Sequence, residues 1–304
     1  MLGPEPQDLK AITILNRIIE WKDDGIYYEA DPRHVDLILK ELSMDHSKGS
    51  DVTGAKFSSQ DTDRELAPDE AFQYRSLAAR FNFLAGDRPD IQFASKEICR
   101  SMAQPMLSDW VRVKKLARYL KGHPRHVLKF GWQDCPGEIN VYVDTDYAGC
   151  PRTRKSTSGG LVMHGDHMIK SWASTQTVIA LSSGEAEYYG VVKGACESIG
   201  ISSIVKDMGM NIQIVLHTDS AAAKGIASRK GIGKVKHLDT RMLWVQSKVD
   251  DQTLRIRKIP GSINPADMLT KYLDGARLRA LLGKLPVQDQ EGRHPLAPRL
   301  QGLK

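Results

Sequence analysis

Cysteine is scarce in this chain of 304 residues, which contains only four. They share neither a C-x-x-C spacing nor a neighbouring histidine cluster, and they are Cys99, Cys135, Cys150 and Cys196. A zinc site or a disulfide framework is therefore poorly supported, and reduced thiols are the simpler interpretation. We expect an intracellular protein, cytoplasmic or nuclear, rather than a secreted one.

Long hydrophobic runs are also missing, so we expect no membrane-spanning helix. The first ten residues, MLGPEPQDLK, have no signal-peptide pattern. Hydrophobic residues make up 41% of the chain and charged residues 26%, a balance that argues against disorder over the whole length. The net charge of +6 indicates a polyanionic partner, without choosing between nucleic acid, acidic protein and anionic lipid.

Apolar periodicity and turn residues divide the chain into five segments. In order, we expect a β-hairpin plus helix over 1–44, a flexible linker over 45–67, a helical region over 68–125, a mixed α/β domain over 126–273, and a helix with a disordered tail over 274–304. The fourth segment has strands first and then alternating helices and strands, which predicts a mixed sheet with flanking helices.

Four acidic residues occupy matching places in the predicted α/β domain. Asp144 and Asp219 each end an apolar strand, Glu187 lies in the first turns of a helix, and Asp267 opens the final helix. Side chains at strand ends and helix starts converge in α/β sheets, and Mg²⁺ prefers carboxylate oxygens. Each acid alone is compatible with a helix cap or a turn, so only the ordered set favours a site for two metal ions.

The local motifs around these acids resemble the ribonuclease H domain of copia-type LTR retrotransposon Pol polyproteins. The matching segments, which cover about residues 138–273, are YVDTDYAGCPRTRKSTSGG, LSSGEAEYYG, HTDSAAA, KHLDTR and IPGSINPADMLTKYL. Upstream, YRSLAARFNFLAGDRPDIQFASKEICRSMAQP and DWVRVKKLARYLKGHPR resemble the end of the reverse transcriptase and its connection to RNase H. The 1–44 segment and the mostly helical 68–125 segment are thus expected to be remnants of the reverse transcriptase and its thumb or connection.

The resemblance implies an endoribonuclease that hydrolyses the RNA strand of RNA–DNA hybrids by a two-metal-ion mechanism. Its catalytic and metal-binding residues would be Asp144, Glu187, Asp219 and Asp267, with Asp146 as an alternative to Asp144, and its cofactor two Mg²⁺ ions or Mn²⁺. No Tyr-x-Asp-Asp motif occurs, so DNA synthesis by this chain is not expected. The missing reverse-transcriptase domains are a candidate partner, and virus-like particles in the cytoplasm are a candidate location.

Hybrid binding requires cationic and neutral contacts to two phosphate backbones. The candidate residues are Arg152, Arg154, Lys155, Ser156, Thr157, Ser158, Lys236 and His237, with the helix face of Arg112, Lys115 and Arg118. A solvated basic face is the simpler alternative for these cations.

Two other functions are compatible with the same pattern. The chain could be a catalytically inactive nucleic-acid-binding relic of a truncated retroelement, although all four acids are present. It could also be an RNase H-like DNA nuclease or integrase, because such enzymes place acidic residues on the same fold.

Overall fold

The computed structural model describes residues 1–55, 63–233 and 235–298. The central part of the expected linker over 45–67 and the end of the expected tail lie outside the described residues. The chain forms two compact units. The second unit comprises Gln133–Lys271, and the first comprises Met1–Trp132 together with Tyr272–Lys304.

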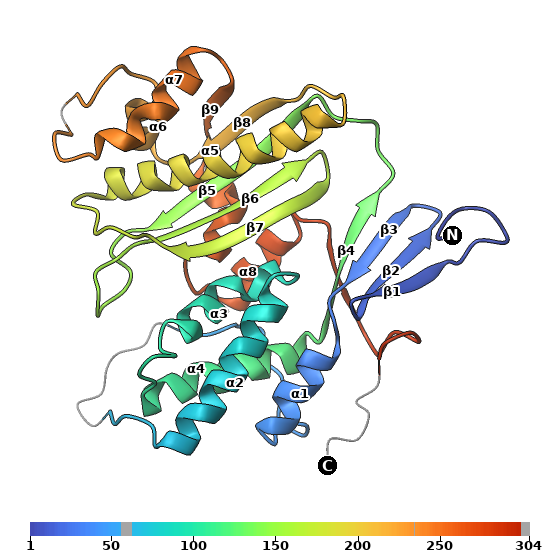
Figure 1. The fold of residues 1–304 in the computed structure, drawn as a ribbon. Helices are drawn as coiled ribbons and strands as arrows, with labels where there is room; N and C mark the ends of the chain where they lie inside the picture. Colours follow the sequence, from blue (N-terminus) through green and yellow to red (C-terminus); the bar gives the residue numbers. More distant parts are fainter. Residues whose placement is uncertain (56–62, 234, 299–304) are drawn as a thin grey trace. The chain divides into compact units, whose positions relative to one another are not determined.

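The second unit is built on a mixed five-stranded sheet in the order β7-β6-β5-β8-β9 (Figure 1). Its strands are β5 (Glu138–Asp146), β6 (Thr157–His164), β7 (His167–Thr175), β8 (Gln213–Thr218) and β9 (Leu254–Lys258). The β5, β6 and β7 strands pair antiparallel, whereas β5, β8 and β9 pair parallel. The expectation of a mixed α/β architecture is therefore confirmed.

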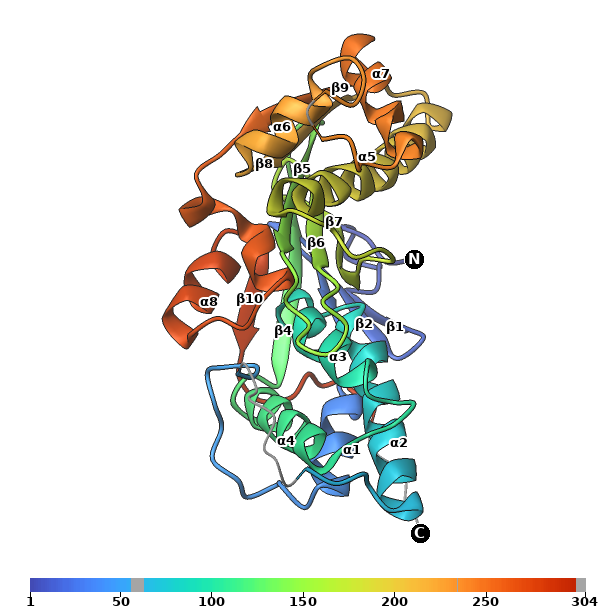
Figure 2. The same cartoon turned by 90° about the vertical axis from the view of Figure 1, so that its left-hand side faces the viewer.

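Helices of the second unit follow the strands β7, β8 and β9 in the chain. They are α5 (Ser183–Asp207), α6 (Ala221–Ala227), η2 (Thr240–Leu243), α7 (Trp244–Asp250), η3 (Gly261–Ile263) and η4 (Pro265–Leu269). The long helix α5 lies across the sheet, as Figures 1 and 2 both show. Ser182 caps its first turn by accepting a hydrogen bond from the Glu185 N–H, and the helix continues without a break through Gly200.

Two glycines bring α5 unusually close to β5. A Cβ atom on Gly190 would lie 2.7 Å from Thr145 Oγ1, and one on Gly194 would lie 2.6 Å from Val143 Cγ1. Val143 belongs to the buried core between the helix and the sheet. This close packing fixes the first turns of α5, including Glu187, against the carboxyl end of β5.

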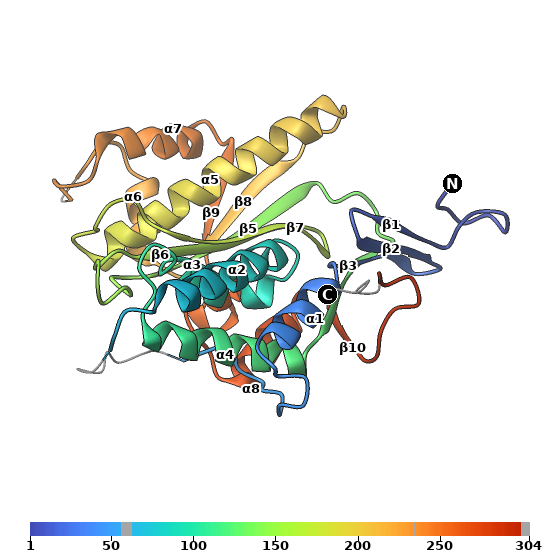
Figure 3. The ribbon, with the colours of Figure 1, turned by 60° about the horizontal axis from the view of Figure 1, so that its bottom comes forward.

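The first unit contains an antiparallel five-stranded sheet in the order β1-β2-β3-β4-β10. Its strands are β1 (Ala11–Ile14), β2 (Arg17–Lys22), β3 (Gly25–Glu29), β4 (Arg125–Gly131) and β10 (Val287–Gln290). Its helices are α1 (Arg33–Glu41), α2 (Pro68–Ala85), η1 (Pro89–Ile91), α3 (Gln92–Cys99), α4 (Leu107–Gly122) and α8 (Gly275–Leu282). The helices α2, α3 and α4 pack together, as Figure 3 shows. Among the described residues, no helix combines the length and apolar character that a membrane span requires.

The first unit departs from the sequence expectations in three places. The N-terminal segment forms three strands rather than two, because Leu15 and Asn16 adopt φ values of 49° and 63° and make an additional tight turn. The strand β4, expected in the α/β domain, pairs instead with β3 and β10. The segment Val287–Gln290, expected to be disordered, is ordered as β10 by its pairing with β4.

Candidate functional site

Three carboxylates from three different elements of the second unit converge at one edge of its sheet. They are Asp144 in β5, Glu187 in α5 and Asp219 directly after β8, and one oxygen of each lies within 4.8 Å of the others. The β5 and β8 strands are parallel, so their carboxyl ends meet at the same edge. The close packing of α5 then brings Glu187 to that edge.

Asp267 flanks this cluster and is joined to it by a lysine. The Lys271 ammonium lies 2.8 Å from Asp267 Oδ1 and 3.8 Å from Asp144 Oδ2. The buried Thr270 hydroxyl donates a hydrogen bond to Asp144 Oδ2. The four acids proposed from the sequence are therefore gathered in one region, with three in direct proximity and Asp267 connected to Asp144 through Lys271.

A buried asparagine positions the segment that carries Asp267. The Asn264 side chain donates from Nδ2 to the Val143 carbonyl at 2.9 Å, and its Oδ1 accepts from the Ala266 N–H at 3.1 Å. Val143 immediately precedes Asp144 in β5. Asn264 thus fixes η4 against the backbone of the strand that carries the first carboxylate.

The crowded carboxylates have raised pKa values. Burial, together with the charges of Asp144 and Asp219, raises the pKa of Glu187 to about 9. Burial also raises the pKa of Asp144, and burial with the charge of Asp267 raises that of Asp219. Burial disfavours the Lys271 ammonium, but its neighbouring carboxylates outweigh this effect and raise its pKa. Assembling these carboxylates in one place is therefore costly unless cations compensate them.

The donor set fits a hard divalent cation. The Glu187 Oε2 atom is buried and has no hydrogen-bond partner, which leaves an oxygen available for coordination. The three converging groups are all carboxylates, and Mg²⁺ and Mn²⁺ prefer such oxygen ligands. The arrangement can hold a divalent ion between β5, α5 and the end of β8.

Asp146, the alternative to Asp144, lies outside the group of converging carboxylates. It occupies the last position of β5, beyond Asp144, and its carboxylate lies beside the following loop. A Cβ atom on Gly149 would lie only 1.7 Å from Asp146 Oδ2. The structure therefore places Asp144, and not Asp146, next to Glu187 and Asp219.

The connection between β5 and β6 carries the first group of proposed phosphate contacts. Arg152 and Arg154 are exposed, and Lys155 is partly exposed. Ser156, Thr157 and Ser158 are buried, in contrast to their expected role as phosphate contacts. Ser156 Oγ accepts from the Ala148 N–H, and Ser158 Oγ accepts from Gln176 Nε2. These buried side chains have no surface for a phosphate contact, which corrects the sequence expectation.

The remaining basic candidates lie in other parts of the chain. Lys236 is exposed, and His237 Nε2 lies 3.1 Å from Glu185 Oε2. The helix face of Arg112, Lys115 and Arg118 belongs to α4 in the first unit. Arg112 forms an ion pair of 2.7 Å with Asp109, so its charge is already partly compensated.

Sequence reasoning missed the roles of Asn264, Thr270 and Lys271. Thr270 and Lys271 follow Asp267 by three and four residues, a spacing that places side chains on the same side of a helical turn as the acid. This spacing could have indicated from the sequence that Thr270 and Lys271 lie beside Asp267. No local signal indicated that Asn264 would reach the backbone of β5, because that contact joins segments 121 residues apart.

No family model matches the chain. It is similar to the "Retrovirus-related Pol polyprotein from transposon TNT 1-94" of Nicotiana tabacum, with 34% identity over 188 residues, which cover 61% of this chain and 14% of that protein. It is also similar to the "Retrovirus-related Pol polyprotein" of transposons RE2 and RE1 of Arabidopsis thaliana, each 28% identical over 219 residues, which cover 71% of this chain and 15% of each relative. The chain thus spans about one seventh of the length of these relatives.

Solved structures give weaker similarities. LC11-RNase H1, isolated from compost, matches with a TM-score of 0.33 and 17% identity, covering 44% of this chain and 93% of that protein. A foamy viral protease-reverse transcriptase in complex with dsDNA matches with a TM-score of 0.26 and 11% identity, covering 83% of this chain and 45% of that protein.

Proposed function

Since this chain is related in sequence to the Pol polyproteins of copia-type retrotransposons, we propose that its second unit is an RNase H-like domain that hydrolyses the RNA strand of RNA–DNA hybrids. The observation that carries the proposal is the convergence of Asp144, Glu187 and Asp219 within 4.8 Å, from three different elements. The motifs that surround these acids are those in which the chain resembles the ribonuclease H domains of that family.

The site would hold two Mg²⁺ ions, or Mn²⁺, through Asp144, Glu187, Asp219 and Asp267. When bound, the ions supply an activated water and stabilise the leaving oxygen of the phosphodiester. The geometry of the carboxylates themselves supports this assignment, because three acids of like charge are brought together and one of their oxygens, Glu187 Oε2, lacks a hydrogen-bond partner.

The protein residues have distinct roles in this proposal. Glu187, whose pKa is about 9 when no ion compensates the cluster, must release its proton from the carboxyl group to become a ligand. The Thr270 hydroxyl holds Asp144 Oδ2 in place, and Lys271 neutralises part of the charge on Asp267. The exposed Arg152 and Arg154 would contact the phosphates of the hybrid, largely independently of its base sequence.

The proposal is tested by cleavage of an RNA–DNA hybrid with labelled RNA in the presence of Mg²⁺. The informative variant is Asp219→Asn, which removes one converging carboxylate with almost no change in shape. Asp146→Asn is the matched control, because it removes a carboxylate close to the site but outside the cluster. We expect Asp219→Asn to reduce the single-turnover rate by roughly 100-fold or more and Asp146→Asn to change it by less than about 5-fold.

Other results would favour the alternative functions. If the folded wild-type chain binds hybrid tightly but does not cut it with Mg²⁺ or Mn²⁺, the inactive-relic hypothesis becomes the better one. Cleavage of duplex DNA would favour an RNase H-like DNA nuclease or integrase. Cleavage that appears only when reverse-transcriptase domains are added would identify those domains as a required partner.

A further inference from the structure

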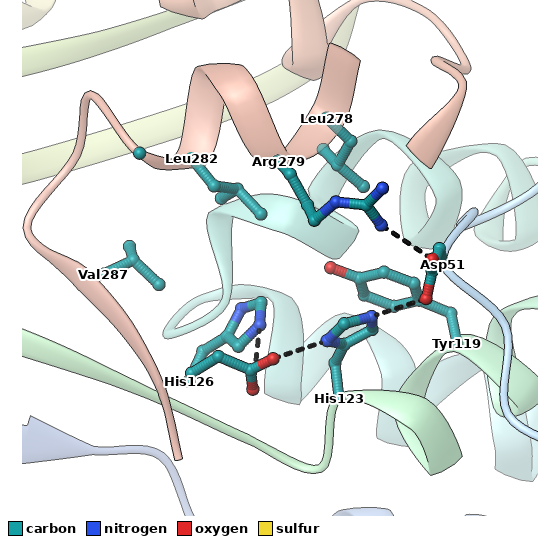
Figure 4. A pocket seen from close by; sticks show the side chains of 10 residues that line it. Asp51, Tyr119, His123, His126, Leu278, Arg279, Leu282 and Val287 are labelled. Carbon is teal, nitrogen blue, oxygen red and sulfur yellow. Dashed lines mark hydrogen bonds and ion pairs between the residues drawn. The ribbon is translucent and has the colours of Figure 1, made fainter. Parts of the chain in front are cut away.

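A second group of possible metal ligands lies entirely within the first unit. His123 directly follows α4, His126 lies in β4, and Asp289 lies in β10, where it is paired with His126 across the two strands. Ring nitrogens of both histidines and a carboxylate oxygen of Asp289 all lie within 4.8 Å of one another. Both imidazoles line a pocket of about 190 Å³ together with residues of α8. Figure 4 shows the two rings close together below that helix.

One ring nitrogen of each histidine, called here the inner nitrogen, faces the Asp289 carboxylate, and the other is called the outer nitrogen. His123 Nδ1 lies 2.7 Å from Asp289 Oδ2, and His126 Nε2 lies 3.6 Å from Asp289 Oδ1. Ligand atoms on one tetrahedral Zn²⁺ ion, each about 2.0 Å from the metal, are about 3.3 Å apart. The two separations, each to a different oxygen of Asp289, lie on either side of that value, and one ligand atom from each residue lies within 4.8 Å of the others.

The outer nitrogens of both histidines also face carboxylates. His123 Nε2 lies 3.4 Å from Asp51 Oδ1, and His126 Nδ1 lies 3.1 Å from Asp90 Oδ2. Imidazoles that bind metals commonly donate their second N–H to a carboxylate, which fixes the tautomer and the ring orientation. His123 has such a hydrogen bond to Asp51, whereas His126 Nδ1 lies beside Asp90 without a hydrogen bond in this structure, so a small rotation of the His126 ring would complete the same arrangement.

Arginines hold the two outer carboxylates in place. Arg279 lies 2.7 Å from Asp51, as Figure 4 also shows, and Arg88 lies 2.7 Å from buried Asp90. With both imidazoles neutral, the three carboxylates and two guanidiniums leave one negative charge uncompensated. A divalent cation between the inner nitrogens and Asp289 would compensate it.

We propose that His123 Nδ1, His126 Nε2 and the Asp289 carboxylate form a zinc site, with a fourth position open to water in the pocket. Two imidazoles and one carboxylate are a ligand set that Zn²⁺ accepts and that Mg²⁺ does not prefer. The ion would anchor the C-terminal strand β10 to the junction of α4 and β4. This site is independent of the carboxylate cluster in the second unit and of the function proposed for it.

The test is a titration of the purified full chain with Co²⁺, a spectroscopic substitute for Zn²⁺, followed by displacement with Zn²⁺. A four-coordinate site with nitrogen ligands gives intense visible absorption, whereas an all-oxygen, six-coordinate carboxylate site gives weak absorption. The spectrum therefore separates this site from the cluster of the second unit. The variants are Asp289→Asn and His123→Gln, and far-UV circular dichroism confirms that both are folded.

The matched control is the double variant His164→Gln/His167→Gln. These histidines have the same sequence spacing as His123 and His126, but they contact the Pro136 carbonyl and Gln133 in the second unit. We expect one equivalent of intense absorption in the wild type and the control, and its loss in Asp289→Asn and His123→Gln. Absence of this absorption in the wild type, or its persistence in both variants, would overturn the proposal and leave the group as a network of ion pairs.

Discussion

Lys271 compensates part of the negative charge of the carboxylate cluster. Lys271 lies next to Asp267 and within 3.8 Å of Asp144, and the negative charges around it raise its pKa. A cation at this position stabilises the metal-free protein, but it also repels a metal ion. Lys271 therefore acts on protein stability and on metal affinity in opposite directions.

The substitution Lys271→Gln separates these two effects. We expect Mg²⁺ to bind roughly 3- to 10-fold more tightly, because the repulsion between two cations is removed, while the metal-free variant unfolds at a lower temperature than the wild type. Isothermal titration calorimetry and thermal unfolding in EDTA measure the two quantities. Lys170→Gln, which removes an ion pair between β7 and Glu197 of α5 away from the site, is the control. Weaker Mg²⁺ binding in Lys271→Gln would show instead that the lysine positions the ligands.

His217 gives the second unit a pH-dependent stability. Burial, with a smaller contribution from the charge of Arg257, lowers the pKa of His217 from 6.5 to about 4. Its Nδ1 atom is buried without a hydrogen-bond partner, and its Nε2 contacts Asn140 Oδ1 at 2.8 Å. The unfolded chain therefore binds a proton more readily than the folded chain between these two pKa values.

We expect neutral His217 to contribute fully to the free energy of unfolding above pH 6.5. This contribution should be lost as the pH falls towards 4. Urea unfolding at a series of pH values, followed by tryptophan fluorescence, measures it. The variant His217→Gln should show a smaller decrease of the unfolding free energy over this interval. An identical pH dependence in wild type and variant would exclude His217 as the titrating group.

At the level of elements, the site depends on how η4 is held against β5. Asn264 is fully buried and makes the hydrogen bonds that join the two segments. Asp267 follows Asn264 by only three residues, so this contact places Asp267 near the end of β5, where Lys271 and Thr270 also hold the segment. The position of Asp267 therefore depends in large part on the Asn264 contact with the strand.

We expect Asn264→Ala to lower the free energy of unfolding by about 1–3 kcal/mol, because the buried Val143 carbonyl loses its donor. It should also weaken Mg²⁺ binding, since Asp267 is no longer fixed. Asn211→Ala, which alters an exposed residue before β8, serves as the control for both measurements. Unchanged Mg²⁺ affinity in a destabilised Asn264→Ala variant would mean that Asp267 is not positioned by this contact.

The sequence was informative about elements whose signal is local. The apolar strand before Asp144 and the Ser182 cap before Glu187 both lie within a few residues of the acids that they position. The pairing of β4 with β10 joins segments far apart in the sequence, so no local pattern could indicate it. The turn at Leu15 and Asn16 was missed because leucine rarely adopts a positive φ.

Features of the site that depend on packing between distant segments were likewise not visible in the sequence. The carboxylates could be proposed from strand ends and helix starts, but the burial of Ser156, Thr157 and Ser158 depends on the packing around β6. Serine and threonine next to three basic residues resemble a phosphate-binding loop in the sequence. Only the hydrogen bonds of Ser156 and Ser158 to Ala148 and Gln176 show that these hydroxyls are directed into the protein.

For the whole molecule, metal binding should stabilise the chain through the second unit. A ligand that binds only the folded state adds about 2.7 kcal/mol of stability at a concentration 100 times its dissociation constant. We expect saturating Mg²⁺ to raise the unfolding temperature of the wild type and to raise that of Asp219→Asn much less. Differential scanning calorimetry with and without EDTA tests this, and equal shifts in both proteins would contradict a site that includes Asp219.

The most direct test of the central claim is strand specificity. The wild-type chain is incubated with Mg²⁺ and with two otherwise identical hybrids, one labelled on the RNA strand and one on the DNA strand, alongside duplex RNA and duplex DNA of the same sequence. The account predicts cleavage of the RNA strand of the hybrid and of no other strand. Cleavage of the DNA strand or of duplex DNA, with the hybrid RNA left intact, would contradict it.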